Sequence, residues 1–153
     1  MKIAVALGSN LGDREANLRG AAAALASLLT SLRVSSFHET EPVGVTTTQP
    51  LFLNAAAVGD SDLPARTLLQ RLLATEAAFG RERPYPGAPR TLDLDLILCG
   101  DEIIDTPDLI VPHPRFRERR FVLAPLSEIA PDWIDPVTGR SIAELLYAIR
   151  HAP

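Results

Sequence analysis

Apolar residues recur along the chain with two different spacings, which predict alternating strands and helices. Short apolar runs bounded by glycine or charged residues predict strands at 2–7, 32–40, 51–58 and 91–99, with a short partner strand at 102–104. Leucines one helical turn apart predict helices at 14–29, 62–80, 121–129 and 141–150. The leading order, β-α-β-β-α-β, is typical of a ferredoxin-like α+β fold.

This order predicts an antiparallel sheet with helices packed on one face, followed by an extra C-terminal hairpin and helices. Helix starts are marked by Asp13 and Ser141 as N-caps, and by Asp62 followed by Pro64. The sequence contains no internal repeat and no linker-like stretch. We therefore expect residues 1–153 to form a single domain.

Composition narrows the class of protein. With 153 residues, of which 46% are apolar and 22% charged, the chain is long and apolar enough for one folded core. Its single cysteine, Cys99, cannot form an internal disulfide, and no apolar run is long enough for a signal peptide or a membrane span. We expect a cytoplasmic monomer, and the net charge of −4 argues against nucleic-acid binding.

Asp93 and Asp95 stand out in the segment RTLDLDLILCG, which runs from Arg90 to Gly100. Because side chains alternate between the faces of a strand, both carboxylates are expected on one face and the leucines on the other. Two carboxylates about 7 Å apart can bind one Mg²⁺ or bridge two. A solvent-exposed polar face would alternate in the same way, although aspartate is depleted in strands. The pattern leaves both interpretations open.

Arginines surround this strand in the sequence. Seven of the fifteen basic residues lie between 81 and 120, namely Arg81, Arg83, Arg90, Arg115, Arg117, Arg119 and Arg120. Arginines interleaved with carboxylates around loops suit a site for a metal ion and a polyphosphate. Ordinary surface ion pairs would look the same at any single position. A P-loop is excluded, because Lys2 is the only lysine and no GxxxxGK[ST] motif is present.

Five segments in this order resemble one family: ALGSNLGDREANL, SSFHETEPVG, FLNAA, APRTLDLDLILCGDEI and VPHPRFRERRFVLAPLSEIAP. The chain is similar over nearly its whole length to the 6-hydroxymethyl-7,8-dihydropterin pyrophosphokinases of folate biosynthesis. The resemblance implies a ferredoxin-like fold, in agreement with the predicted strand order. The sequence departs from the family pattern in loop 82–89, with Pro84 and Gly87 where some members carry a lysine and a tryptophan.

The resemblance also implies the reaction and the residues that perform it. The β,γ-pyrophosphoryl group of ATP would pass to the hydroxymethyl oxygen of the dihydropterin, with release of AMP. Two Mg²⁺ ions would be held by Asp93 and Asp95, which with Arg81 and Arg90 form the expected catalytic set. The expected ATP contacts are Glu76, Arg81, Arg83, Arg90, Leu96, His113 and Arg119. The expected pterin contacts are Thr40, Val43, Phe52, Asn54, Asp93 and Phe121.

Loops 43–50 and 81–89 are polar, and prolines lie at their ends. We therefore expect them to become ordered as lids when both substrates are bound. Two other functions are compatible with a pair of aspartates on a strand. A DxD-type nucleotidyltransferase would release pyrophosphate in place of AMP, and a non-enzymatic ligand-binding module would show no turnover. Neither alternative accounts for the FLNAA and VPHPRF segments.

Overall fold

The structure is a computed structural model that describes residues 1–41, 50–80 and 91–150. Its elements in chain order are β1 (Lys2–Ser9), α1 (Arg14–Ala26), β2 (Thr30–Val34), β3 (His38–Thr40), β4 (Phe52–Asp60), α2 (Ala65–Ala78), β5 (Asp93–Cys99), β6 (Ile104–Thr106), β7 (Leu109–Val111), the 3-10 helix η1 (Phe116–Glu118), α3 (Arg120–Ile129) and α4 (Ile142–Arg150). The expected lids fall almost entirely outside the described residues, so their closure stays a prediction. No helix in the described part of the chain is long and apolar enough to cross a bilayer.

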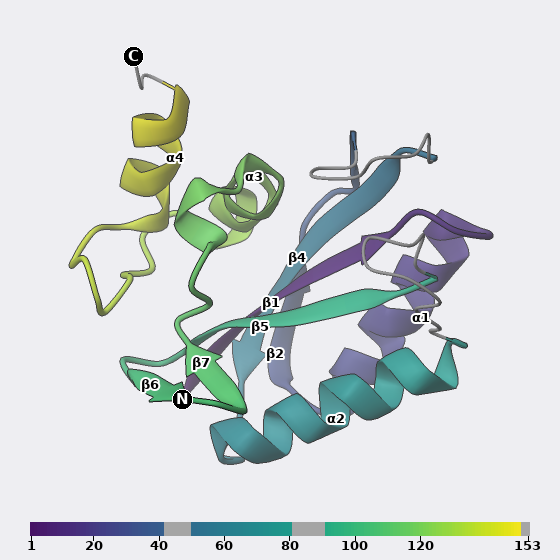
Figure 1. Cartoon of the computed structure of the whole chain (residues 1–153), viewed down its shortest axis with the longest axis horizontal. Helices are drawn as coiled ribbons and strands as arrows, with labels where there is room; N and C mark the ends of the chain where they lie inside the picture. The colour runs from purple at the N-terminus through teal and green to yellow at the C-terminus, as the bar shows by residue number, and fades with distance from the viewer. Residues whose placement is uncertain (42–49, 81–90, 151–153) are drawn as a thin grey trace.

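β1 lies inside an antiparallel sheet with the order β2-β4-β1-β5 (Figure 1). β3 pairs with the beginning of β4, on the same edge as β2. The helix α1 connects β1 to β2, and α2 connects β4 to β5. This is the β-α-β-β-α-β arrangement that the apolar pattern predicts, and the ferredoxin-like α+β prediction is confirmed.

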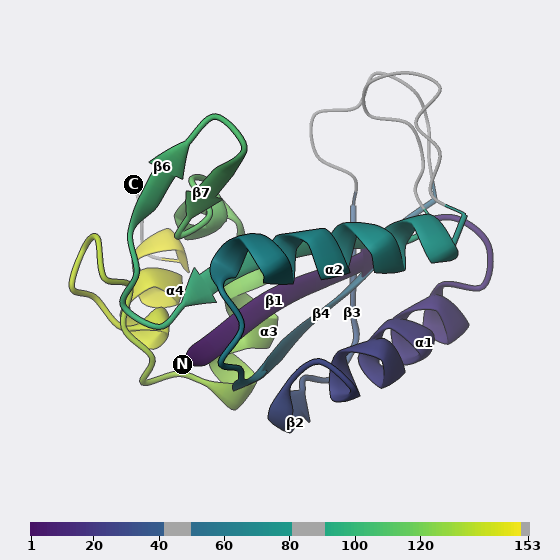
Figure 2. The ribbon, with the colours of Figure 1, turned by 90° about the horizontal axis from the view of Figure 1, so that it is seen from below.

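The helices α1 and α2 lie beside each other on one face of the sheet (Figure 2). Their buried leucines, including Leu18 and Leu25 of α1 and Leu68 and Leu72 of α2, pack on the apolar side chains of β1 and β5. Asp13 caps α1 by accepting a hydrogen bond from the Ala16 N–H at 3.1 Å. These helices and the Asp13 cap were all predicted from the sequence.

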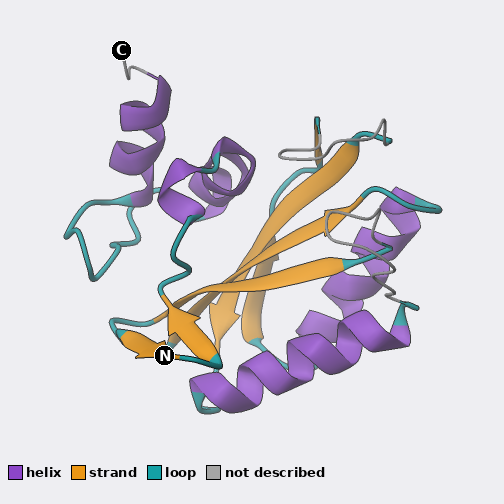
Figure 3. Cartoon of the chain, viewed as in Figure 1, coloured by secondary structure: helices purple, strands orange, loops and turns teal. Residues whose placement is uncertain are grey.

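The other face of the sheet is covered as well, by α3, and α4 packs on the outer side of α3 (Figure 3). The expectation of helices on one face only was therefore wrong. The small side chains of Ala4, Ala6 and Ala56 make this face apolar, so it also has to be buried, and they leave room for α3. A register shift between β1 and β5 turns both Ile97 and Leu98 toward this second core.

Two local predictions fail because side-chain hydrogen bonds or turns override the apolar pattern. The run 32–40 forms two strands, because Ser35 bonds to both backbone groups of Ala56 and interrupts the ladder. The run 102–104 does not pair with β5, because Gly100, at φ +58°, turns the chain away. Residues Ile104–Thr106 instead pair with Leu109–Val111 in a separate hairpin.

The helix ends follow the sequence signals except at one position. Asp62 does not cap α2, since Pro64 occupies the N-cap and no side chain bonds there. Gly80, at φ +74°, follows the end of α2 as predicted. Ser141 caps α4, with its hydroxyl accepting from the Glu144 N–H and the Glu144 carboxylate accepting from the Ser141 N–H.

Gly59 in β4 allows Leu29 and the Thr30 backbone to pack closely against the strand. A β-carbon there would lie 2.8 Å from Leu29 Cβ and 2.8 Å from the Thr30 carbonyl oxygen. Because that backbone is held by strand pairing, we predict that Gly59→Ala lowers the free energy of unfolding by about 1–3 kcal/mol.

The matched substitution Gly20→Ala is expected to lower the free energy of unfolding by less than Gly59→Ala does. Its β-carbon would lie 2.6 Å from the ring of Phe79, which is a side chain that can shift, and alanine favours helix over glycine. Urea unfolding followed by circular dichroism measures both variants. Equal losses in the two would contradict this account of Gly59.

Candidate active site

Asp93 and Asp95 lie on the same face of β5, close to its beginning. Asp93 is opposite Gly8 and Asp95 is opposite Ala6 of β1. Both aspartates are half-buried, whereas the leucines that alternate with them are buried beneath α1 and α2. The predicted alternation is confirmed, and both carboxylates are on the side of the sheet that carries α3.

Thr40, Phe52 and Asn54 form a cluster on this same face, next to the aspartates. Asn54 is opposite Gly8 on the other side of β1, so one row of residues runs from Asp93 across Gly8 to Asn54. The side-chain nitrogen of Asn54 donates a hydrogen bond to Thr40 Oγ1. Phe52 is opposite Thr40 on β3. The structure thus brings together three residues that the resemblance assigns to the pterin.

Gly8 lies in the middle of this row and was not singled out from the sequence. A β-carbon on Gly8 would lie 3.1 Å from Asn54 Oδ1 and 3.6 Å from Phe52 Cδ1. Glycine therefore lets both side chains lie close over the β1 backbone. A glycine within a strand is a signal for such a close approach, and in the sequence it had been interpreted only as the end of the strand.

His113 lies close to the aspartates although it is distant from them in sequence. Its backbone N–H donates to the Ile97 carbonyl at 3.0 Å, and its Nδ1 accepts from the Arg115 N–H at 3.2 Å. Burial and the positive charge of Arg119 lower the pKa of His113 to about 4, against the opposing effect of Asp93. The imidazole is therefore neutral at pH 7, with its proton on Nε2.

Arg119 and Phe121 lie next to each other where η1 meets α3. The Arg119 guanidinium carbon is 5.7 Å from the centre of the Phe121 ring, within range of a cation–π contact. Both side chains are half-buried. His113, Arg119 and Asp93 interact electrostatically, so predicted phosphate-binding and pterin-binding residues meet at this end of the sheet.

Arg117 lies between these residues in sequence but has a structural role. Its guanidinium donates to both carboxylate oxygens of Asp135, at 2.5 and 2.9 Å. Asp135 is fully buried and also accepts hydrogen bonds from the Val137 N–H and the Thr138 hydroxyl. Burial opposes these bonds, yet together they lower the pKa of Asp135. This contact ties η1 to the loop before α4.

Glu76 and Leu96, both expected to contact ATP, lie on the opposite side of the sheet from the aspartates. Glu76 of α2 is only 2% exposed, and its carboxylate accepts a hydrogen bond from the Leu94 N–H at 2.7 Å. The Leu96 side chain is buried in the core beneath α1 and α2. Glu76 therefore supports β5 between its two aspartates, and the ATP contacts of both residues stay predictions.

The remaining predicted site residues, Arg81, Arg83, Arg90 and Val43, lie outside the described residues. Within the described ranges, no group of three or more histidine, cysteine or acidic side chains could hold a metal ion. Two carboxylates are nevertheless a donor set that fits Mg²⁺ with a nucleotide, because that ion commonly takes one or two carboxylates together with substrate phosphates.

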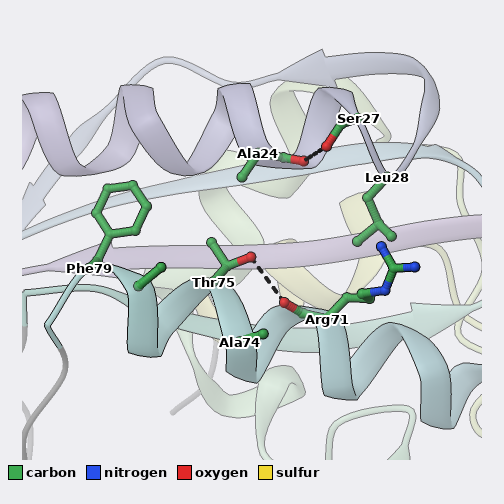
Figure 4. Close-up of a pocket in the computed structure, with 8 residues that line it drawn as sticks. Ala24, Ser27, Leu28, Arg71, Ala74, Thr75 and Phe79 are labelled. Atoms are coloured by element: carbon green, nitrogen blue, oxygen red, sulfur yellow. Dashed lines mark hydrogen bonds between the residues drawn. The ribbon is translucent and has the colours of Figure 1, made fainter.

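A cleft of about 290 Å³ lies between α1 and α2, on the face away from the aspartates (Figure 4). The hydroxyls of Ser27 and Thr75 there donate to carbonyl oxygens of their own helices. The cleft is lined by Ala24, Ser27, Leu28, Arg71, Ala74, Thr75, Ala78 and Phe79. None of the predicted site residues lines it, so we interpret it as a gap between helices.

Comparison with known proteins identifies the family of the chain. Residues 4–131 match the family model described as 7,8-dihydro-6-hydroxymethylpterin-pyrophosphokinase (HPPK). The chain belongs to this family. It is therefore an enzyme of pyrophosphoryl transfer in folate biosynthesis, as the resemblance implied.

Several relatives are named 2-amino-4-hydroxy-6-hydroxymethyldihydropteridine pyrophosphokinase. The protein from Synechocystis sp. is 44% identical over 144 residues, which cover 93% of this chain and 73% of that protein. The protein from Bacillus subtilis is 49% identical over 127 residues, covering 82% and 75%. The protein from Pseudomonas aeruginosa is 40% identical over 149 residues, covering 96% and 91%.

Solved structures of HPPK-DHPS share the fold at low sequence identity. A complex with substrates superposes with a TM-score of 0.71 at 12% identity, covering 96% of this chain and 43% of that one. The wild-type protein from Plasmodium falciparum gives a TM-score of 0.71 at 12% identity, covering 95% and 44%. This chain thus spans less than half of those longer chains.

The environment of His113 leads to a prediction that can be tested by NMR. We expect its imidazole to titrate with a pKa of about 4. Arg119→Gln should raise that pKa, because a positive charge is removed, and Asp93→Asn should lower it. Between the ordinary histidine pKa of 6.5 and about 4, the unfolded chain binds more protons than the folded one. Stability should therefore fall as the pH decreases through this window.

The measurement follows the imidazole Cε1–H signal of His113 in the wild-type protein and both variants. A His113 pKa at or above 6.5 in the wild-type protein would contradict the neutral, buried imidazole.

Proposed function

We propose that this enzyme transfers the β,γ-pyrophosphoryl group of ATP to the hydroxymethyl oxygen of 6-hydroxymethyl-7,8-dihydropterin and releases AMP. The observation that carries the proposal is the row from Asp93 across Gly8 to Asn54. It joins a pair of carboxylates to an amide and aromatic cluster on one face of the sheet. The names of the relatives support the same substrates.

The phosphate half of the site consists of the anionic pair Asp93 and Asp95, the cationic Arg119 and the neutral His113. Asp93 and Asp95 would hold two Mg²⁺ ions, which supply positive charge to the polyphosphate. Arg119 adds a fixed positive charge, and neutral His113 offers its Nε2–H as a hydrogen-bond donor. Further ATP contacts are proposed for Arg81, Arg83, Arg90, Glu76 and Leu96.

The pterin half of the site suits a flat, polar heteroaromatic ring. The Phe121 and Phe52 rings offer stacking surfaces, and the Asn54 amide offers hydrogen bonds. Because Asn54 Nδ2 donates to Thr40, its Oδ1 is directed over Gly8 and can accept from a ring N–H. Val43 and Asp93 complete the proposed pterin contacts.

The chemical step needs the pterin oxygen in line with the β-phosphorus of ATP. The bond from that oxygen to phosphorus forms as the bond to the α,β-bridging oxygen breaks, and AMP leaves with the bridging oxygen. The hydroxymethyl proton passes to a phosphate oxygen or to water. The residues described above bind and orient the two substrates, which is the main contribution of protein groups to this kind of transfer.

We also propose that residues 1–153 act as one catalytic domain, as a cytoplasmic monomer that binds small molecules rather than nucleic acid or membranes. The net charge of −4 supports the absence of a nucleic-acid partner. Size-exclusion chromatography with light scattering tests the monomer.

The first prediction concerns the product and the metal. ATP should be converted to AMP only when the hydroxymethylpterin and Mg²⁺ are both present. Asp95→Asn should lower kcat by about 100-fold or more, because a metal-binding charge is lost.

Asp105→Asn, which changes an exposed aspartate of the β6–β7 hairpin, is the matched control and should retain full activity. Quantifying AMP and pyrophosphate by ion-exchange chromatography distinguishes the reactions. Release of pyrophosphate without AMP would favour the nucleotidyltransferase alternative.

The second prediction concerns Gly8. The added methyl group of Gly8→Ala would press on Asn54 and Phe52 without touching the aspartates' chemistry. We expect the KM for the pterin to rise about tenfold and the KM for ATP to stay within about twofold. Steady-state kinetics with Gly20→Ala as control measure this. An unchanged pterin KM would show that the ring does not lie over Gly8.

A further inference from the structure

A hydrogen-bonded network of Ser36, His38 and Glu128 joins β3 to the last turn of α3. One Glu128 oxygen, Oε1, accepts from the Ser36 hydroxyl at 2.7 Å and contacts His38 Nε2. The other, Oε2, accepts from the Ser36 N–H at 3.0 Å. The network connects segments that are about ninety residues apart in the sequence, and none of the expected site residues belongs to it.

The network adjoins the proposed pterin cluster, because His38 belongs to the same short strand, β3, as Thr40. His38 is opposite Asn54 of β4, and Thr40, two residues further along, is opposite Phe52. Side chains of paired residues and of residues two apart share one face of a sheet. His38 therefore lies on the same face as Thr40 and Asn54, and on the same short strand as Thr40.

The helix α3 carries both the aromatic residue and the anchor. Phe121 is in its first turn and Glu128 in its last, seven residues apart. Seven residues make about two helical turns, so both side chains are on the same side of the helix, about 10 Å apart along its axis. The two segments that flank the proposed pterin slot, β3 and α3, are thus joined at the end away from the ring.

The anchor is a charged group with several partners. Burial raises the pKa of Glu128, but the hydrogen bonds from Ser36 and His38 outweigh it and lower that pKa. The carboxylate is therefore ionised at neutral pH, and hydrogen bonds to an ionised acceptor are stronger than neutral ones. Three donors on one carboxylate restrict how far α3 can move relative to β3.

We infer that His38 and Glu128 are positioning residues that fix the separation of β3 from α3, and with it the width of the pterin slot between Asn54 and Phe121. The inference rests on the proposed function, because it takes the pterin to lie in that slot. Neither residue contacts the ligand; they act through Thr40 and Phe121. Loosening the network should weaken pterin binding and leave ATP binding intact.

The experiment uses three variants of the full chain and one matched control. Glu128→Gln removes the charge, His38→Leu removes the donor, and His38→Gln restores a side-chain N–H that can reach Glu128. The control is Glu144→Gln, which changes another carboxylate that accepts a hydrogen bond from a serine N–H, but in the cap of α4. The dissociation constant of 6-hydroxymethylpterin is measured by fluorescence titration. That of the magnesium complex of α,β-methylene ATP is measured by calorimetry.

Glu128→Gln and His38→Leu are expected to weaken pterin binding about tenfold while ATP-analogue binding stays within about twofold. His38→Gln and Glu144→Gln should bind both ligands like the wild-type protein. Thermal unfolding of each variant confirms that the titrations are made well below the melting temperature, so a general loss of stability does not imitate the effect.

Two results would overturn this inference and leave the proposed function intact. One is wild-type pterin affinity in both Glu128→Gln and His38→Leu, and the other is equal weakening of pterin and ATP-analogue binding. If His38→Gln did not restore pterin affinity, the hydrogen bond from residue 38 to Glu128 would not be what positions β3. If the wild-type protein itself bound no pterin, the proposed function would be wrong, and the inference with it.

Discussion

The geometry of the site depends on the register of one strand. β5 buries Leu94 and Leu96 on the side of α1 and α2 and thereby turns Asp93 and Asp95 to the other side. Each buried leucine contributes about 1.5–3 kcal/mol, which exceeds the about 0.2–1 kcal/mol at stake between like charges on one face. A slip of one residue would bury both carboxylates in an apolar core. Burial of the leucines therefore places the carboxylates.

The same register places the rest of the site along one row. β1 is paired with β5 on one side and β4 on the other, so Asp93 and Asn54 are both opposite Gly8. Further along these strands the row gives way to alanines, over which α3 packs. The face that carries the site is thus divided into an apolar part covered by α3 and a polar part at the strand ends. Two substrates of different chemistry, an anionic polyphosphate and a flat heteroaromatic ring, would meet at that polar end.

The C-terminal part of the chain supplies groups that the sheet lacks. Arg119 and Phe121 are presented where η1 joins α3, and the buried contact between Arg117 and Asp135 holds η1 in place. The buried Asp135 carboxylate has further hydrogen-bond donors, because it also accepts from the Val137 N–H and the Thr138 hydroxyl in the loop that follows α3. Solved HPPK-DHPS structures keep this fold at 12% identity. Such a divergence shows how much sequence change the arrangement of strands and helices tolerates.

The parts of the protein that depend on local periodicity and on capping chemistry could be predicted from the sequence. These are the helices α1, α2, α3 and α4, the alternation along β5, the caps at Asp13 and Ser141, and the segments that resemble the family. Family motifs also led to Asn54, Thr40, Phe52, His113 and Phe121, which the structure brings to one end of the sheet.

Other features depend on contacts between residues that are distant in the chain, and these could not be predicted from local sequence. Two of these features concern the sheet and its surroundings: the packing of α3 on the second face and the hairpin of β6 and β7. Three are individual contacts: the break at Ser35, the close approach at Gly8 and the contact of His38 with Glu128. Each is set by strand register or by packing between segments tens of residues apart. Local apolar spacing carries no information about which distant residue will be the neighbour, so these features follow only from the folded chain.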